Sequence, residues 1–448
     1  MRKINIHKIL RAAAVIMTLT VSCACSSEWI EDLWPGLDGE SGNLGDRTPN
    51  EESRKVLLLY SAGFNSLSSY LKDDIKDLKK GWVPGGRRPD DILLVYSHFP
   101  EAGSGYSKQT SPTLVRLYSR DTTVIADTLV TYPEGTISAS AEQLNTVLTY
   151  IRDEFQAKSY GMIFSSHATG YLPTGYYQNQ DNVFSEEVTW RARRRMSMTA
   201  VPYTEPEHDP SMPMVKSIGQ DQVGTSGNYM SYEIELKDFS DAIPMHLDYI
   251  LFDACLMGGV EVAYELKEKV GKIGFSQTEV LAEGFCYESL TTHLLNIEEP
   301  APQRVCEDYF HQYEVMSGVY QSATISLIDC SRLDLLADTC RDLFAKYADG
   351  IGAVSPSKVQ RFFRSGRHWF YDLESILINA GISDTDLKRL HEVLDGCVQY
   401  KAHTPRFMNE FEIHTFCGLS MYLPNHGSER LSKFYKTLKW NQATGLVI

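Results

Sequence analysis

Two side chains capable of nucleophilic chemistry, those of Cys255 and His167, each follow a short apolar run. The run YILF (249–252) leads through an aspartate and an alanine to Cys255, and a Gly-Gly pair then opens a helical pattern. The run GMIF (161–164) leads through two serines to His167. Unbroken apolar runs of this kind are typical of buried parallel strands. If the two strands are neighbours, the thiol and the imidazole emerge about 5 Å apart at one sheet edge, or about 10 Å apart if one strand intervenes.

This placement favours a histidine base that activates a cysteine nucleophile. The carboxyl ends of parallel strands are where α/β proteins place their chemistry, and a helix N-terminus favours a thiolate. The alternative for Cys255 is a buried cysteine that acts as a small hydrophobic residue, and a lone strand-end histidine is more often structural or solvated. No Gly-x-Ser-x-Gly turn and no phosphate-binding glycine loop competes with this pair.

The elements around the pair predict an α/β fold with a mostly parallel sheet and helices on both faces. The core should span residues 54–299 and open with the strand KVLLLY (55–60), and a C-terminal mixed α/β region over 300–448 should pack on it. Helices are expected from about residue 135 and over 229–243, and a late strand over 418–424. Over 168–228 the pattern dissolves, and a loop of this length inside an α/β unit is usually functional or disordered.

The first 25 residues are typical of an export signal. A basic region precedes the apolar run 12–21, and Ser-Cys-Ala-Cys follows, so Cys23 or Cys25 is the expected lipid acceptor. The match is imperfect because Leu19 stands one position too far from Cys23, and a plain cleaved secretory signal is the alternative. Residues 26–53 suggest a flexible tether, and no second run is long enough to span a bilayer. The body is therefore expected on a lipid anchor at a bacterial envelope membrane, facing the periplasm or the exterior.

The composition disfavours several classes of function. A net charge of −15 argues against non-specific nucleic-acid binding. The cysteines after the signal form no CxxC pair and no cluster with histidine, so neither a zinc site nor a dense disulfide framework is expected. Their number is odd, which leaves at least one free thiol if the others pair, and Cys255 is the preferred one. The 25 tyrosines would also suit a glycan-handling protein, but no paired carboxylates stand out.

Several segments resemble the clostripain-like cysteine peptidases, which belong to the clan of caspases, legumains and gingipains. SSHATGYLP (165–173) and FDACLMGGVEVAYEL (252–266), in this order, are similar to the two catalytic blocks of that family. The segments LLLYSAGFNSL, SQTEVLAEGFCY, YDLESIL and GLSMYLP extend the resemblance over residues 54–440. The resemblance implies a caspase-like fold and an endopeptidase that cleaves peptides and proteins after Arg or Lys.

The resemblance also implies roles for single residues of the two blocks. His167 would be the general base and Cys255 the nucleophile, and the backbone N–H groups of Cys255 and Ala168 would form the oxyanion hole. The chain departs from the family in this turn, because the usual His-Gly is His167-Ala168 here and the usual Trp is Tyr171. A different class of protein therefore stays open, namely a catalytically impaired surface lipoprotein that keeps the peptidase fold and only binds peptides.

Acidic residues would select the substrate. Asp253 matches a family carboxylate in the first specificity pocket, where it could pair with a guanidinium in bidentate fashion, although it could also be a structural hydrogen-bond acceptor. Glu283 is the expected second acid, and Glu279 competes with it for this role. Because Glu reaches farther than Asp, a Lys or mixed preference stays open.

The segment RARRR (191–195) lies between the two catalytic blocks. Members of the family often mature by self-cleavage after a basic residue in this region, so Arg193, Arg194 or Arg195 is the expected processing site. A solvated basic loop that balances an acidic surface is the alternative. No cofactor or metal is expected. Only the family resemblance suggests that calcium could bind, and the sequence contains no EF-hand spacing.

Overall fold

A nine-stranded sheet forms the centre of the described fold. The computed structural model describes residues 54–85, 90–176, 199–203, 212, 221–225, 228–364, 369–424 and 426–448. The strands of the sheet are β1 Lys55–Ala62, β2 Ile92–His98, β3 Thr113–Arg120, β4 Thr123–Thr131, β5 Ser159–Ser165, β9 Leu247–Asp253, β10 Val270–Phe275, β11 Thr324–Asp329 and β13 Val398–His403. They follow the order β13-β11-β10-β9-β5-β1-β2-β3-β4. Neighbours from β10 to β2 pair in parallel, and the outer pairs are antiparallel.

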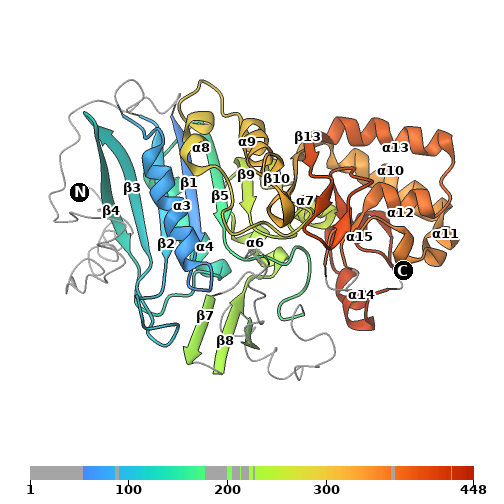
Figure 1. Ribbon diagram of the computed structural model, residues 1–448, viewed down its shortest axis with the longest axis horizontal. Coiled ribbons are helices and arrows are strands. Elements are labelled where there is room, and N and C mark those ends of the chain that lie inside the picture. Colours follow the sequence, from blue (N-terminus) through green and yellow to red (C-terminus); the bar gives the residue numbers. More distant parts are fainter. Residues whose placement is uncertain are drawn as a thin grey trace, which may run out of the picture.

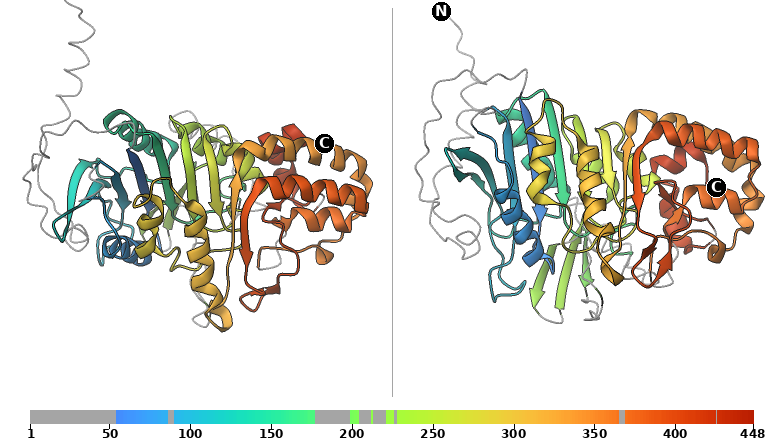
Figure 2. Two further views of the ribbon diagram at one scale, coloured as in Figure 1. Left: turned by 90° about the horizontal axis from the view of Figure 1, so that it is seen from above. Right: turned by 45° about the horizontal axis from the view of Figure 1, so that its top comes forward.

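Helices cover both faces of this sheet (Figure 1). On one face α3 (Ser68–Lys80) packs against α8 (Tyr287–Leu294), which packs against α9 (Pro302–Glu314). On the other face α4 (Ala141–Glu154) contacts α6 (Leu236–Ala242), which contacts α7 (Val260–Leu266). The view from above separates the two helix layers (Figure 2). The expected α/β class, with a mostly parallel sheet between helices, is therefore confirmed.

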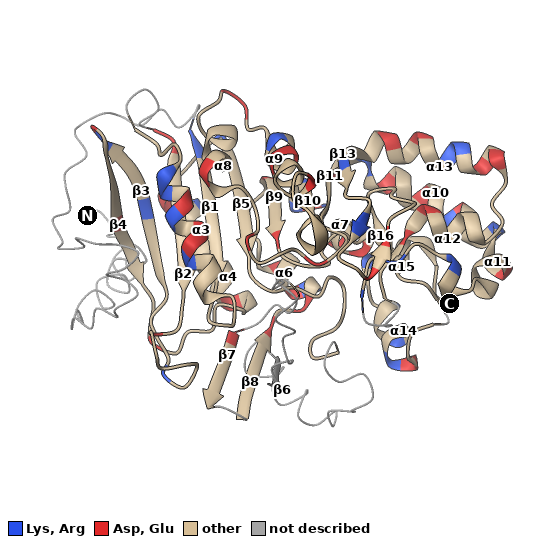
Figure 3. Ribbon diagram, viewed as in Figure 1, with Lys and Arg blue, Asp and Glu red and all other residues tan. Residues whose placement is uncertain are grey.

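The central strands are buried on both faces, which explains their unbroken apolar runs. Every residue of β1 and β2 is buried. The ring of Tyr60 stacks on Tyr96 at 4.3 Å and on Phe164 at 5.6 Å, so one aromatic layer links β2, β1 and β5. Charged side chains gather instead on the helices, among them α3 and α9 (Figure 3).

The C-terminal part of the chain extends the same sheet, because β11 and β13 both follow residue 299. The expected division at residues 299 and 300 stays a prediction, and the sheet runs across it. Beyond the β13 edge lies a group of helices (Figure 1). Their bounds are α10 Leu333–Lys346, α11 Ala348–Ala353, α12 Leu373–Asn379, α13 Asp384–Cys397, α14 Glu429–Tyr435 and α15 Lys439–Thr444.

Small sheets and single turns of 3-10 helix complete the described structure. A three-stranded sheet has the order β6-β8-β7, and β12 pairs with β16 as β14 pairs with β15. These strands are β6 Thr199–Tyr203, β7 Asp221–Thr225, β8 Asn228–Glu233, β12 Tyr371–Asp372, β14 Arg406–Phe407, β15 Phe411–Glu412 and β16 Ser420–Met421. The 3-10 turns are η1 Gly318–Tyr320, η2 Cys330–Arg332 and η3 Pro356–Lys358.

Three expected elements differ in the structure. The helix expected over 229–243 is wrong in its first half, where strand β8 precedes α6; the buried positions of β8 include Ser231 and Glu233, whose polarity hides the strand alternation. The helix expected from residue 135 begins at Ala141, where the Ser140 hydroxyl caps it by accepting the Gln143 N–H. The strand expected over 418–424 is shorter in the structure, where it comprises only β16.

Three properties bear on the expectations about anchoring, metals and disulfides. None of the described helices is long and apolar enough to cross a bilayer. No group of three or more His, Cys, Asp or Glu side chains in the described ranges could hold a metal ion. The cysteines in those ranges, Cys255 among them, are all free thiols.

Candidate active site

Strands β5 and β9 are parallel neighbours and place His167 and Cys255 at one edge of the sheet. In the register of the pair, Ser165 lies opposite Asp253. His167 and Cys255 each follow two residues later, so the chain brings the imidazole and the thiol out of adjacent strands. The two strands are direct neighbours in the sheet, with no strand between them.

The turns that follow the two strands touch each other. Gly170 has a φ of 62°, and a Cβ on it would lie 2.5 Å from the carbonyl oxygen of Leu256, so this close approach requires glycine. Leu256 itself has a φ of 61°, an uncommon conformation for a residue with a side chain. Its N–H donates to the Thr278 carbonyl at 2.9 Å, and the Gly258 N–H donates to the Ser276 carbonyl at 2.7 Å. These bonds hold the turn after Cys255 in its strained shape.

His167 is buried, with 5% of the residue's surface exposed. Its Nε2 lies 3.1 Å from the Ser66 hydroxyl. Ser66 follows β1, the strand beside β5, so three neighbouring strands contribute side chains to this edge. The sequence reasoning did not single out Ser66, although its position just after the first strand was a usable signal.

The departures from the family in the histidine turn fit the structure without backbone strain. Ala168 does not adopt a positive φ; the left-handed residue of this turn is Gly170. Tyr171 is fully buried, its hydroxyl donates to the Trp369 carbonyl at 2.8 Å, and its ring packs edge-on against Phe370. The alanine therefore gives no conformational reason for impaired catalysis.

The Cys255 thiol has no exposed surface in this structure. Its Sγ accepts a hydrogen bond from the Val280 N–H at 3.0 Å and lies 3.7 Å from the Val280 carbonyl oxygen. The segment 276–282, which follows β10, is buried throughout and covers the sulfur. The thiol is therefore closed to solvent in this state.

Asp253 lies beneath the edge on the face covered by α8. It is fully buried and accepts hydrogen bonds from the Ser165 hydroxyl at 3.1 Å and from the Tyr287 hydroxyl at 2.7 Å. Glu283 is exposed in the loop before α8. The pKa of Tyr313 is raised well above its ordinary value, chiefly by burial and further by Tyr309 and by the charges of Asp253 and Glu283. The charges of Asp253 and Glu283 therefore both disfavour ionisation of the Tyr313 hydroxyl.

Glu279, the competing acid, already has a cationic partner. It is 1% exposed, and its Oε2 lies 2.7 Å from Nε of Arg364. Burial raises the pKa of Glu279, and the Arg364 charge acts in the opposite direction. This carboxylate is paired inside the protein, whereas Glu283 faces solvent.

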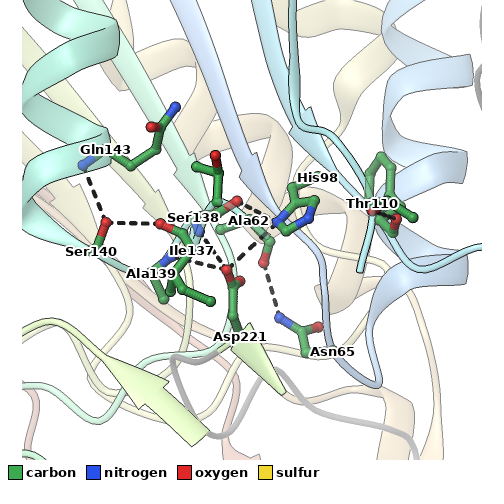
Figure 4. A network of polar contacts seen from close by, with 12 residues as sticks. Ala62, Asn65, His98, Thr110, Ile137, Ser138, Ala139, Ser140, Gln143 and Asp221 are labelled. Atoms are coloured by element: carbon green, nitrogen blue, oxygen red, sulfur yellow. Dashed lines mark hydrogen bonds and ion pairs between the residues drawn. The ribbon is translucent and has the colours of Figure 1, made fainter. Parts of the chain in front are cut away.

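The far end of the segment between the catalytic blocks is anchored by Asp221, the first residue of β7 (Figure 4). Asp221 is fully buried and accepts hydrogen bonds from the N–H groups of Ser138 and Ala139. Its Oδ2 lies 3.6 Å from Nδ1 of His98, which in turn lies 2.7 Å from the Ser138 hydroxyl. The expected processing residues Arg193, Arg194 and Arg195 and the expected lipid acceptors Cys23 and Cys25 lie outside the described residues.

Comparisons with known proteins agree with this geometry. The model of the clostripain family matches residues 59–188 and 205–439, most of the chain. Comparison with curated protein sequences gave no match. The solved structure of an inactive zymogen C11 protease from Parabacteroides distasonis is 25% identical, with a TM-score of 0.67 over 89% of this chain and 99% of that one.

A secreted C11 cysteine protease from Bacteroides thetaiotaomicron, solved with an irreversible peptide inhibitor, is 23% identical. Its TM-score is 0.64 over 88% of this chain and 99% of that chain, which supports the fold. The resemblance noted in the two catalytic blocks and the caspase-like fold are thereby confirmed. The chain belongs to the clostripain family and is a cysteine endopeptidase.

Proposed function

We propose that this endopeptidase uses a His167–Cys255 dyad to cleave peptide bonds after Arg or Lys. The observation that supports the dyad most directly is the register of β5 and β9, which brings both residues to one sheet edge. In this mechanism the imidazole takes the thiol proton and later returns it to the leaving amine. The backbone N–H groups of Cys255 and Ala168 stabilise the oxyanion.

Selection of a basic residue before the cleaved bond rests on Asp253 and Glu283. Asp253 places a buried carboxylate two residues before the proposed nucleophile, and Glu283 adds an exposed carboxylate in the loop before α8. A cationic substrate side chain that reaches both carboxylates would meet two negative charges. Because a guanidinium pairs with a carboxylate in bidentate fashion, Arg is favoured over Lys at Asp253, and the longer Glu283 side chain leaves room for Lys.

The test is turnover of matched fluorogenic peptides with Arg, Lys or Leu before the cleaved bond. Cys255→Ala and His167→Ala should each abolish turnover while the proteins keep their thermal unfolding midpoint. Asp253→Asn should weaken turnover of the basic peptides relative to the Leu peptide. Cleavage that survives in Cys255→Ala would refute the dyad, and equal cleavage of all three peptides would refute the basic specificity.

We further propose that the described state is latent and that self-cleavage after Arg193, Arg194 or Arg195 activates it. The buried thiol supports latency, and the similarity to a protein solved as an inactive zymogen agrees with it. The arginines fall in the gap between the two segments that match the family. Asp221 would keep the downstream piece attached to the core after the chain is cut.

Intact-mass measurement of the wild type and of Cys255→Ala tests this proposal. The wild type should convert to two chains cut within 193–195, and Cys255→Ala should stay whole. Labelling with an Arg-directed electrophile should modify Cys255 in the cleaved protein and hardly at all in a variant whose three arginines are replaced by glutamine. Single chains of equal mass in the wild type and Cys255→Ala would refute self-processing.

The N-terminal segment supports export and attachment by lipid. The basic region, the apolar run and the cysteines at 23 and 25 are the features that carry this proposal. Metabolic labelling with a fatty acid in a bacterial host should mark the wild type and lose the mark in either Cys23→Ala or Cys25→Ala, which would identify the acceptor. A secreted, unlabelled mature protein would instead favour a plain cleaved signal.

A further inference from the structure

A cavity of about 70 Å³ lies beside the histidine turn, on the face of the sheet opposite Asp253. His167 and Ala168 line one side of it, Glu233 of β8 lines another, and the rings of Phe164, Phe239 and Phe252 form its apolar wall. By the volume that one buried water needs, this cavity has room for on the order of five water-sized groups, about the size of a leucine side chain. Cys255 is not among the described residues that line it.

The alternation of side chains along β5 and β9 determines on which face of the sheet each residue lies. Phe164 and Phe252 are register partners, and both rings contact Phe239 of α6, with centroids 5.2 and 5.8 Å away. The next pair, Ser165 and Asp253, therefore points to the other face, where Asp253 meets α8. One sheet edge thus has an acidic side toward α8 and an apolar side toward α6.

An extended peptide that crosses this edge projects consecutive side chains in opposite directions. If the residue before the cleaved bond points toward Asp253, the residue after it points toward the cavity. The position of His167 agrees with this direction, because the base that protonates the leaving amine belongs beside the leaving group and it lines the cavity. This step rests on the proposed function.

We propose that the cavity is the subsite for the residue that directly follows the cleaved bond, and that it takes a medium-sized apolar side chain such as Leu, Ile or Met. The three phenylalanine rings supply the apolar contact area. A charged side chain would have to leave water to enter this space, which is costly. An acidic side chain would in addition face Glu233.

Both carboxylate oxygens of Glu233 already accept hydrogen bonds within the protein, so Glu233 does not bind a cationic side chain of the substrate. Its Oε2 accepts the Gly175 N–H at 2.9 Å, and its Oε1 accepts the Ser231 hydroxyl at 3.3 Å. Burial raises the pKa of Glu233 to about 7. The carboxyl therefore ties the end of the histidine turn to β8 and fixes one wall of the subsite.

The experiment compares kcat/KM of the processed enzyme for peptides with one Arg before the cleaved bond and Leu, Gly or Asp after it. Leu should exceed Gly on the order of tenfold, as expected for an aliphatic side chain that fills an apolar pocket, and Asp should be the poorest. Ala139→Leu, which adds bulk at a residue that lines the cavity, should bring the Leu-to-Gly ratio close to one. Ala141→Leu adds the same bulk at a buried residue that is not among those lining the cavity, and should keep the ratio.

The outcomes separate this inference from the proposed function. Equal rates for Leu and Gly, with Arg still required, would overturn the subsite and leave the peptidase intact. If Ala139→Leu alters discrimination at the residues before the bond instead, the assignment of the cavity is wrong. No cleavage of any peptide by a processed, folded protein would refute the proposed function and this inference together.

Discussion

Replacement of Glu261 by glutamine should change how the stability of the protein depends on pH. Glu261 lies in the first turn of α7, shortly after the Cys255 turn, and is fully buried. Its Oε1 accepts hydrogen bonds from the Tyr422 N–H at 2.9 Å and from the Tyr435 hydroxyl at 2.7 Å. Burial raises the pKa of this carboxyl from 4.5 to about 7, although these hydrogen bonds act in the opposite direction.

The raised pKa means that the protonated carboxyl favours the folded state. Its contribution to stability is fully present below pH 4.5, where both states hold the proton, and is lost as the pH rises through about 7. Between pH 4.5 and about 7 the Glu261 carboxyl is ionised in the unfolded chain and protonated in the folded chain. Unfolding therefore releases a proton, and the free energy of unfolding falls as the pH rises. The shift corresponds to roughly 3 kcal/mol of unfolding free energy.

Urea unfolding of wild type and Glu261→Gln between pH 4.5 and pH 8, both in a Cys255→Ala background to prevent self-cleavage, measures this effect. Relative to the variant, the parent should lose roughly 3 kcal/mol across the window. Any constant cost of the amide cancels, because only the change with pH is compared. Glu268→Gln, at an exposed carboxylate near the end of the same helix, is the control. Parallel pH profiles for Glu261→Gln and its parent would refute the reasoning.

Three further substitutions test the packing around the site. Gly161→Ala should destabilise by about 1–3 kcal/mol in urea unfolding and lower turnover, because its Cβ would lie 2.0 Å from the Tyr249 ring between β5 and β9. Gly396→Ala, inside α13 with nothing near its Cβ, should stabilise by about 0.5–1 kcal/mol. Arg364→Met should cost about 2–3 kcal/mol by stranding Glu279, and adding Glu279→Gln should recover part of it; full additivity would contradict a coupled pair.

The neighbourhood of His167 and Cys255 could be predicted from sequence because it depends on a simple rule. Both residues end fully apolar runs, and the carboxyl ends of parallel strands meet at one edge. That rule needs no knowledge of side-chain contacts. The family resemblance then gave the two residues their roles, and the register of β5 with β9 agrees with the proximity it requires.

The rest of the site could not be predicted, because it depends on contacts between segments far apart in the chain. Asp221 falls in the stretch without a regular pattern and Glu233 in the segment expected to be helical. Their roles come from the turns that they hold at residues 138–139 and 175. Strand β8 was mistaken for a helix because its buried positions are polar. The burial of Cys255 involves segment 276–282, whose mixed polar and apolar residues give no sign that Val280 contacts the thiol.

Other long-range contacts join the C-terminal part of the chain to the sheet edge that holds His167 and Cys255. The histidine turn is fastened to it through Tyr171 and the Trp369 carbonyl. The helix after the nucleophile is fastened to it through Glu261, and the Ser420 N–H donates to the Gly258 carbonyl in the turn between them. Both turns of the proposed dyad are thus held in part by residues beyond 300. A change in how that part packs would shift His167 and Cys255 together, and the proposed activation by a cut elsewhere in the chain would require such a shift.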